Sequence, residues 1–128
     1  MAAFKFQKST TKLDICGHLY EVDYTSKPLM EALQGFAFEA MERSKALQAA
    51  TDENVDPATL KTMLEESIQF VLSSIDSVLG AGAAAQIFDG RAVTMEDACD
   101  VITYVIHEVE GARMKRLARY TPGRERRG

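Results

Sequence analysis

Hydrophobic residues recur along most of this chain at the three- and four-residue steps of an amphipathic helix. The longest such pattern covers residues 57–79 and follows Asp56, a good helix N-cap, and Pro57, which suits the first helical turn. We predict a helix here whose apolar face forms the centre of the core, with Ile68 and Leu72 inside it. Its apolar positions are Leu60, Met63, Leu64, Ile68, Val71, Leu72, Ile75, Val78 and Leu79.

Two more long helices are predicted on either side of this one. The first begins at Thr25 or Ser26, since a hydroxyl N-cap followed by Pro28 marks a helix start. The third begins at Thr94, with Asp97 three residues on in a near capping box, and its apolar stripe runs to Val109. The apolar face of the first helix comprises Leu29, Leu33, Phe36, Ala37, Ala40, Met41, Ser44 and Leu47.

The N-terminal part instead alternates apolar and polar residues around Gly17, in the stretch LDICGHLYEVDYT. This alternation predicts two short strands joined by a turn, with an apolar face that must rest on helices or on another subunit. The apolar positions are Leu13, Ile15, Leu19, Val22 and Tyr24. The predicted fold class is therefore mainly α: a small N-terminal β-hairpin followed by a bundle of three long helices, with a short helical turn (AAAQIF) between the second and third.

The glycines at 80 and 82 resemble a nucleotide-binding loop, because Gly80, Gly82 and Ala85 fit the pattern G-x-G-x-x-A. A dinucleotide loop has to follow a buried strand, whereas these glycines follow a helical pattern. Glycine at a helix end is the usual C-cap, since it adopts the left-handed conformation without a Cβ clash. We interpret this stretch as a helix stop.

The charge of the chain is unevenly distributed. The 128 residues carry a net charge of −4, but residues 1–112 hold 8 Lys and Arg against 18 Asp and Glu, whereas residues 113–128 hold 7 against one. We predict a single domain over 1–112 and a basic, partly disordered C-terminal extension over 113–128. An acidic body with a basic end fits self-association, docking on an acidic partner or simply a solvated tail, and it disfavours nucleic acid, which the body would repel.

No pattern of catalytic or metal-binding residues emerges. Cys16, His18, Cys99 and His107 lack the paired spacing of zinc modules, and no recognised nucleophile sequence surrounds either cysteine. No apolar run is long enough for a membrane helix, and no export signal is visible at the N-terminus. We expect reduced thiols, no cofactor, no metal and no enzymatic activity.

Three stretches of the chain carry a resemblance to a known family. They are GHLYEVDYTSKPLMEAL, IDSVLGAGAAAQIFDGR and MEDACDVITYVIHEV, which together span roughly residues 13–110. Their order and content resemble the tail assembly chaperones of long-tailed (siphovirus-type) bacteriophages and prophages of Gram-positive bacteria. Leu79 stands where that family's pattern has Phe, and Asp89 stands where it commonly has Gly.

The resemblance implies a chaperone that binds and solubilises the tape measure protein and helps recruit tail tube subunits during tail assembly. Such a protein works in the host cytoplasm and is absent from the mature virion. Two alternatives stay open: a structural phage protein, such as a head–tail connector or minor tail component, and a small acidic regulator that binds a host protein. The residues expected to bind partners are Phe36, Phe38, Met41, Arg113, Lys115, Arg116 and Arg119.

Overall fold

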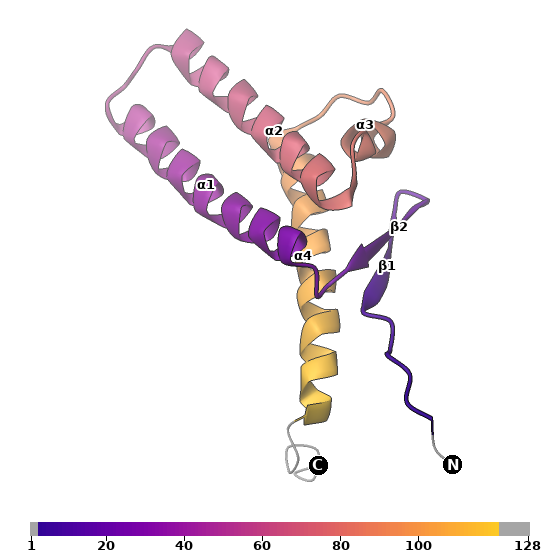
Figure 1. The fold of residues 1–128 in the computed structure, drawn as a ribbon. Helices are drawn as coiled ribbons and strands as arrows, with labels where there is room; N and C mark the ends of the chain where they lie inside the picture. The colour runs from indigo at the N-terminus through magenta and orange to yellow at the C-terminus, as the bar shows by residue number, and fades with distance from the viewer. Residues whose placement is uncertain (1–2, 121–128) are drawn as a thin grey trace, which may run out of the picture.

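The computed structural model describes residues 3–120 and confirms the predicted fold class. A two-stranded antiparallel hairpin precedes three long helices, and a short helix lies between the second and third (Figure 1). A single 3₁₀ turn, η1, follows the last helix. The elements are β1 (Thr10–Ile15), β2 (His18–Asp23), α1 (Lys27–Asp52), α2 (Pro57–Leu79), α3 (Ala83–Phe88), α4 (Met95–Leu117) and η1 (Ala118–Tyr120).

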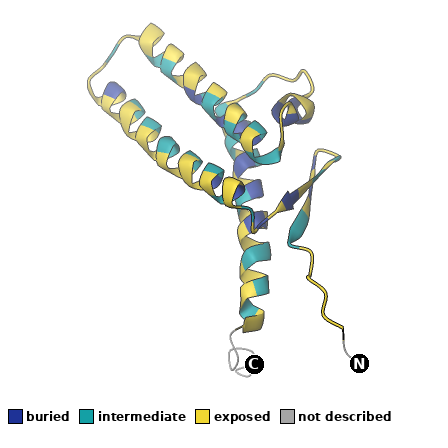
Figure 2. Ribbon diagram, in the orientation of Figure 1, coloured by how far each residue is buried: buried dark blue, intermediate teal, exposed yellow. Residues whose placement is uncertain are grey.

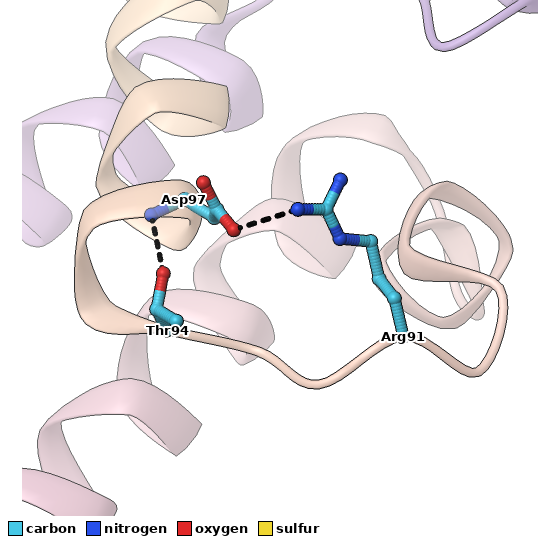
Figure 3. Close-up of polar contacts among 3 residues, drawn as sticks. All are labelled: Arg91, Thr94 and Asp97. Atoms are coloured by element: carbon cyan, nitrogen blue, oxygen red, sulfur yellow. Dashed lines mark hydrogen bonds and ion pairs between the residues drawn. The ribbon is translucent and has the colours of Figure 1, made fainter.

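Each long helix begins where the sequence predicts it. The side chains of Ser26, Asp56 and Thr94 each accept a hydrogen bond from the backbone N–H three residues on, at 3.3, 3.0 and 3.1 Å. These bonds satisfy N–H groups that have no partner inside the helix. At the start of α4, Arg91 also donates to Asp97 at 3.1 Å, which ties the preceding loop to the first turn (Figure 3).

The three long helices pack together at one end and diverge from there, which gives the molecule an open shape (Figure 1). The helices α1 and α2 form an antiparallel pair, which we call the arm, and α4 crosses the base of this arm and runs away from it (Figure 1). The helix α2 packs against both α1 and α4. The half of the arm near the α1–α2 loop therefore lacks a third helix over it.

The core lies at this junction, where the hairpin, α3 and the three long helices converge (Figure 2). Ile68 is only half-buried and lies outside the core, so the prediction that places it inside is wrong, whereas the half-buried Leu72 packs against the core. Because α4 crosses the base of α2, Val71 and Ile75 are the α2 residues that it covers most fully. The largest fully buried side chains are Leu13, Ile75, Ile102, Val105 and Val109.

The hairpin rests on α4 through β1 and on α2 through β2, as its apolar face requires. Cys16 and Gly17 form its two-residue turn, with φ of 54° and 86°. The antiparallel register pairs Leu19 with Asp14 on the outer face. Leu19 is 71 % exposed, so its prediction as a member of the apolar face is wrong, because an odd spacing to Val22 puts the two on opposite faces.

The glycine corner joins α2 to α3, and its left-handed residue is Gly82 rather than Gly80. Gly80 ends α2 with φ 120° and ψ 154°, an extended conformation open mainly to glycine, whereas Gly82 has φ 83° and ψ −1°. Asp76 spans the corner by accepting a hydrogen bond from the N–H of Ala84 at 2.8 Å. The corner lets Ile87 and Phe88 of α3 pack back on the core.

The helix α4 continues through the basic sequence at its end. It passes Gly111 without a break and includes Arg113, Lys115 and Arg116. The predicted boundary between residues 112 and 113 therefore falls inside a helix, and cations in the last turn suit the negative end of its dipole. Residues 121–128 of the predicted extension lie outside the described part of the chain.

Candidate functional site

A cleft of about 250 Å³ opens where the arm meets the start of α4. We call it the junction cleft. Most of its walls are apolar, and its small side chains come from positions where α1 and α2 face each other. Small residues let another backbone come close, so the cleft suits an apolar side chain or one face of a helix. Its lining residues are Phe36, Ala40, Arg43, Ser44, Leu47, Ser67, Phe70, Val71, Met95 and Cys99.

One wall of the junction cleft is an aromatic pair held by an arginine. Phe36 stacks on Phe70 with ring centroids 5.4 Å apart and planes 6° apart. The guanidinium of Arg43 lies 4.9 Å from the centre of the Phe70 ring, and its Nε lies 3.2 Å from a carboxylate oxygen of Glu39. Arg43 therefore makes an ion pair with Glu39 and a cation–π contact with Phe70, although its buried Nε forms no hydrogen bond among the described residues.

The α4 side of the cleft contributes Met95 and Cys99. Burial raises the pKa of the Cys99 thiol, and the carboxylates of Asp100 and Glu96 raise it further. The thiol is thus protonated at neutral pH and acts as a small apolar group, and acidic side chains flank this side of the cleft.

The predicted partner-binding residues of α1 divide between two surfaces. Phe36 lies on the apolar face of α1, as predicted, and is half-buried in the cleft wall, where it stacks on Phe70. Phe38, which lies off the apolar stripe of α1, is 69 % exposed. Met41 is 60 % exposed, so its prediction as a member of the apolar face is wrong. The cleft itself has only a faint signal in the sequence: small residues such as Ala40 and Ser44 inside an apolar stripe.

The predicted basic residues lie at the C-terminal end of α4 and in η1, whereas the start of α4 lines the junction cleft. We call this group the basic end; it comprises Arg113, Lys115, Arg116 and Arg119. Two of them line a pocket of about 290 Å³ between the hairpin, the start of α1 and the end of α4. Arg116 donates to the Tyr120 hydroxyl at 3.3 Å, and Arg119 donates to the Gln7 side chain at 2.6 Å. The pocket is lined by Tyr24, Thr25, Met30, Arg113, Arg116, Leu117 and Tyr120.

Asp23 connects the hairpin to this region. Its carboxylate accepts hydrogen bonds from Ser9 Oγ at 2.9 Å, from the Thr25 N–H at 2.9 Å and from Thr25 Oγ1 at 2.7 Å. These bonds, with a smaller effect from the Arg116 charge, lower the pKa of Asp23 below its ordinary value of 3.8. The charged carboxylate is therefore favoured in the folded state.

Replacing Asp23 with Asn should lower the melting temperature at pH 7, because the variant lacks the charge that these donors favour. A lowered folded-state pKa stabilises the protein above pH 3.8 and loses that effect as the pH falls through the folded value. The gap between wild type and variant should thus close on acidification, as measured by thermal denaturation between pH 7 and pH 2. An equal gap at every pH would contradict this assignment.

The other candidate residues do not assemble into a reactive site. Within residues 3–120, no three or more His, Cys, Asp and Glu side chains are placed to hold a metal ion. Cys16 is an exposed thiol at the hairpin turn, and Cys99 is a half-buried thiol in the cleft. In the same part of the chain, none of the helices combines the length and the apolarity needed to cross a bilayer.

The comparisons with known proteins give a family. The model of the family described as "Family of unknown function (DUF6673)" matches residues 16–128, and the chain belongs to that family. Neither the comparison with curated proteins nor the comparison with solved structures found a match.

Proposed function

We propose that this member of the DUF6673 family is a tail assembly chaperone of a long-tailed phage. In this proposal the protein binds the apolar, helical tape measure protein in the host cytoplasm, keeps it soluble and helps recruit tail tube subunits. It leaves before the virion is complete, so mass spectrometry of purified virions should not find it.

The junction cleft is the observation that carries this proposal. It presents aromatic, aliphatic and small side chains to solvent between three helices, a combination that suits an amphipathic helix laid into a groove. Met95 lies at its edge, and a flexible thioether adapts to different apolar side chains. A chaperone for a long helical protein needs this tolerance, because successive segments of its client differ in sequence.

Exposed apolar side chains of the arm support the same function. The arm exposes Phe38 and Met41 of α1 and Leu64 of α2, the last being 44 % exposed. Exposed large apolar side chains near an apolar cleft are typical of a protein-binding surface. Weak contacts of this kind, repeated by many copies along one client, add up to strong binding.

Co-expression with the tape measure protein of the same phage tests the proposal. We expect the client to become soluble and to elute with several copies of this chain in size-exclusion chromatography with light scattering. Ala40→Glu puts a charge inside the cleft and should weaken the complex at least tenfold, since burying an unpaired carboxylate is costly. Ala46→Glu adds the same charge at an exposed α1 position outside the cleft and should bind like wild type.

Cys99 reports directly on whether the cleft is the binding site. In a Cys16→Ser variant, Cys99 is the remaining thiol, and a bound client should slow its alkylation. An insoluble client in the presence of this chain would overturn the proposal. A soluble complex in which Ala40→Glu binds normally and Cys99 stays unprotected would move the binding site away from the cleft.

A further inference from the structure

We propose that the chain associates with a second copy of itself, with the basic end of one copy docking on the outer face of α2 in the next. The docking surface, which we call the α2 face, is lined by Glu65, Glu66, Ile68, Gln69, Leu72 and Val93, and it shares Arg43 and Phe70 with the junction cleft. The pairing is argued from this surface and the basic end and does not rest on the proposed function.

The α2 face combines acidic and apolar side chains. It is a shallow hollow of about 710 Å³, in which Ile68, Leu72 and Val93 are half-buried and the two glutamates are exposed. Neither glutamate forms an ion pair with any residue among 3–120. Arg43 also reaches this hollow, but its guanidinium is already engaged by Glu39 and Phe70. The face therefore offers unneutralised negative charge around an apolar centre.

The basic end complements the α2 face both in charge and in apolar contact area. Lys115 and Arg119 are exposed, and neither pairs with a carboxylate among the described residues. Beside them, Met114 and Tyr120 are 53 % and 64 % exposed and supply apolar contact area. Complementary charge around apolar contact area favours a specific interface between two proteins. Among the described residues, the α2 face and the basic end therefore match in charge and in apolar character.

The two surfaces cannot meet within one chain. Val93 of the α2 face lies two residues before α4, and the basic end occupies the last turns of that helix. A 23-residue helix holds its ends about 34 Å apart, and α4 runs away from the arm (Figure 1). Docking must therefore be intermolecular. Because different surfaces of the two copies meet, the contact is heterologous and leaves one free surface at each end.

Charge reversal on each surface tests the pairing. Light scattering should give the wild-type chain a mass of at least twice 14.1 kDa at low ionic strength, falling toward 14.1 kDa in about 1 M salt, where charges are screened. Glu65→Lys/Glu66→Lys and Lys115→Glu/Arg119→Glu should each be monomeric alone. Mixing the two variants should restore association, because the intact basic end of the first then meets the intact α2 face of the second.

A matched control reverses two other exposed glutamates, Glu31→Lys and Glu108→Lys, which change the net charge equally but lie outside both surfaces. It should associate like wild type. A monomeric wild-type chain at low salt, or a mixture of the two variants that stays monomeric, would overturn the pairing. Circular dichroism of each variant confirms that the charge changes leave it folded. Client binding by a monomeric variant would show that this pairing and the proposed function stand separately.

Discussion

Replacing Ile75 with Asp should leave a chain that no longer unfolds cooperatively. Ile75 is 0 % exposed and lies in the core with Ile102 and Val105 of α4, which are 2 % and 0 % exposed. The substitution removes a buried aliphatic side chain, worth about 2–5 kcal/mol, and adds an unpaired buried carboxylate that costs several more. Together these losses are comparable to the whole stability of a typical domain, about 5–15 kcal/mol. Thermal melting followed by circular dichroism measures the outcome.

The matched control is Ile68→Asp, the same chemical change on the same stripe of α2, two helical turns before Ile75. Ile68 is half-buried, so its replacement should cost about 1 kcal/mol and leave a cooperative transition. A cooperative Ile75→Asp variant that melts near wild type would show that the core is centred elsewhere. Equal damage from both substitutions would mean that the arm is covered more fully in solution, for instance by a second copy.

The contrast between Ile68 and Ile75 illustrates what an apolar pattern can predict. Both residues belong to the same stripe of α2, and the stripe correctly predicts the helix and the face that turns inward. The depth of burial depends on where α4 crosses α2, and that crossing is set by the loop through α3 and by the position of the hairpin. Such long-range geometry leaves no local signal in the sequence.

Local signals, by contrast, predict the element boundaries well. The caps at Ser26, Asp56 and Thr94 act within one helical turn, so a few neighbouring residues determine each helix start. The hairpin turn at Cys16–Gly17 is equally local. The prediction of the face on which Leu19 lies is wrong because the two-residue alternation of a strand depends on the register that the turn sets. A shift of one residue moves a side chain to the other face of the hairpin.

The candidate site also has parts that local sequence signals predict and a part that depends on long-range geometry. The basic end and the exposed Phe38 are visible in the sequence, because charge and departure from a stripe are local properties. The junction cleft leaves only a faint signal in the sequence, since it joins residues from three helices that lie far apart along the chain, such as Ala40, Phe70 and Cys99. The cleft exists because α4 covers only the base of the arm.

Replacing Asp76 with Ala should destabilise the protein by about 1–3 kcal/mol. The Asp76 carboxylate accepts a hydrogen bond from the buried N–H of Ala84 at 2.8 Å, and an alanine leaves that donor without its partner. Asp76→Asn keeps an acceptor oxygen at the same place and should lose less. Urea denaturation measures the free energies of unfolding, and hydrogen exchange of residues 83–88 reports whether α3 loosens.

The Asp76 variants also test whether the sequence stretch that contains Asp76 serves the structure of the corner or contacts the client. Asp76 belongs to the stretch IDSVLGAGAAAQIFDGR, part of the resemblance to tail assembly chaperones, and it spans the corner that turns α3 back on the core. If Asp76→Ala loosens α3 while Asp76→Asn is mild, this acidic residue is retained for the architecture of the corner. Client binding would then depend on the cleft that the corner helps to position, and Ala40→Glu would impair binding in a fully stable protein. If Asp76→Ala is as stable as wild type but loses client binding, Asp76 contacts the client, and the binding surface extends from the cleft to the corner.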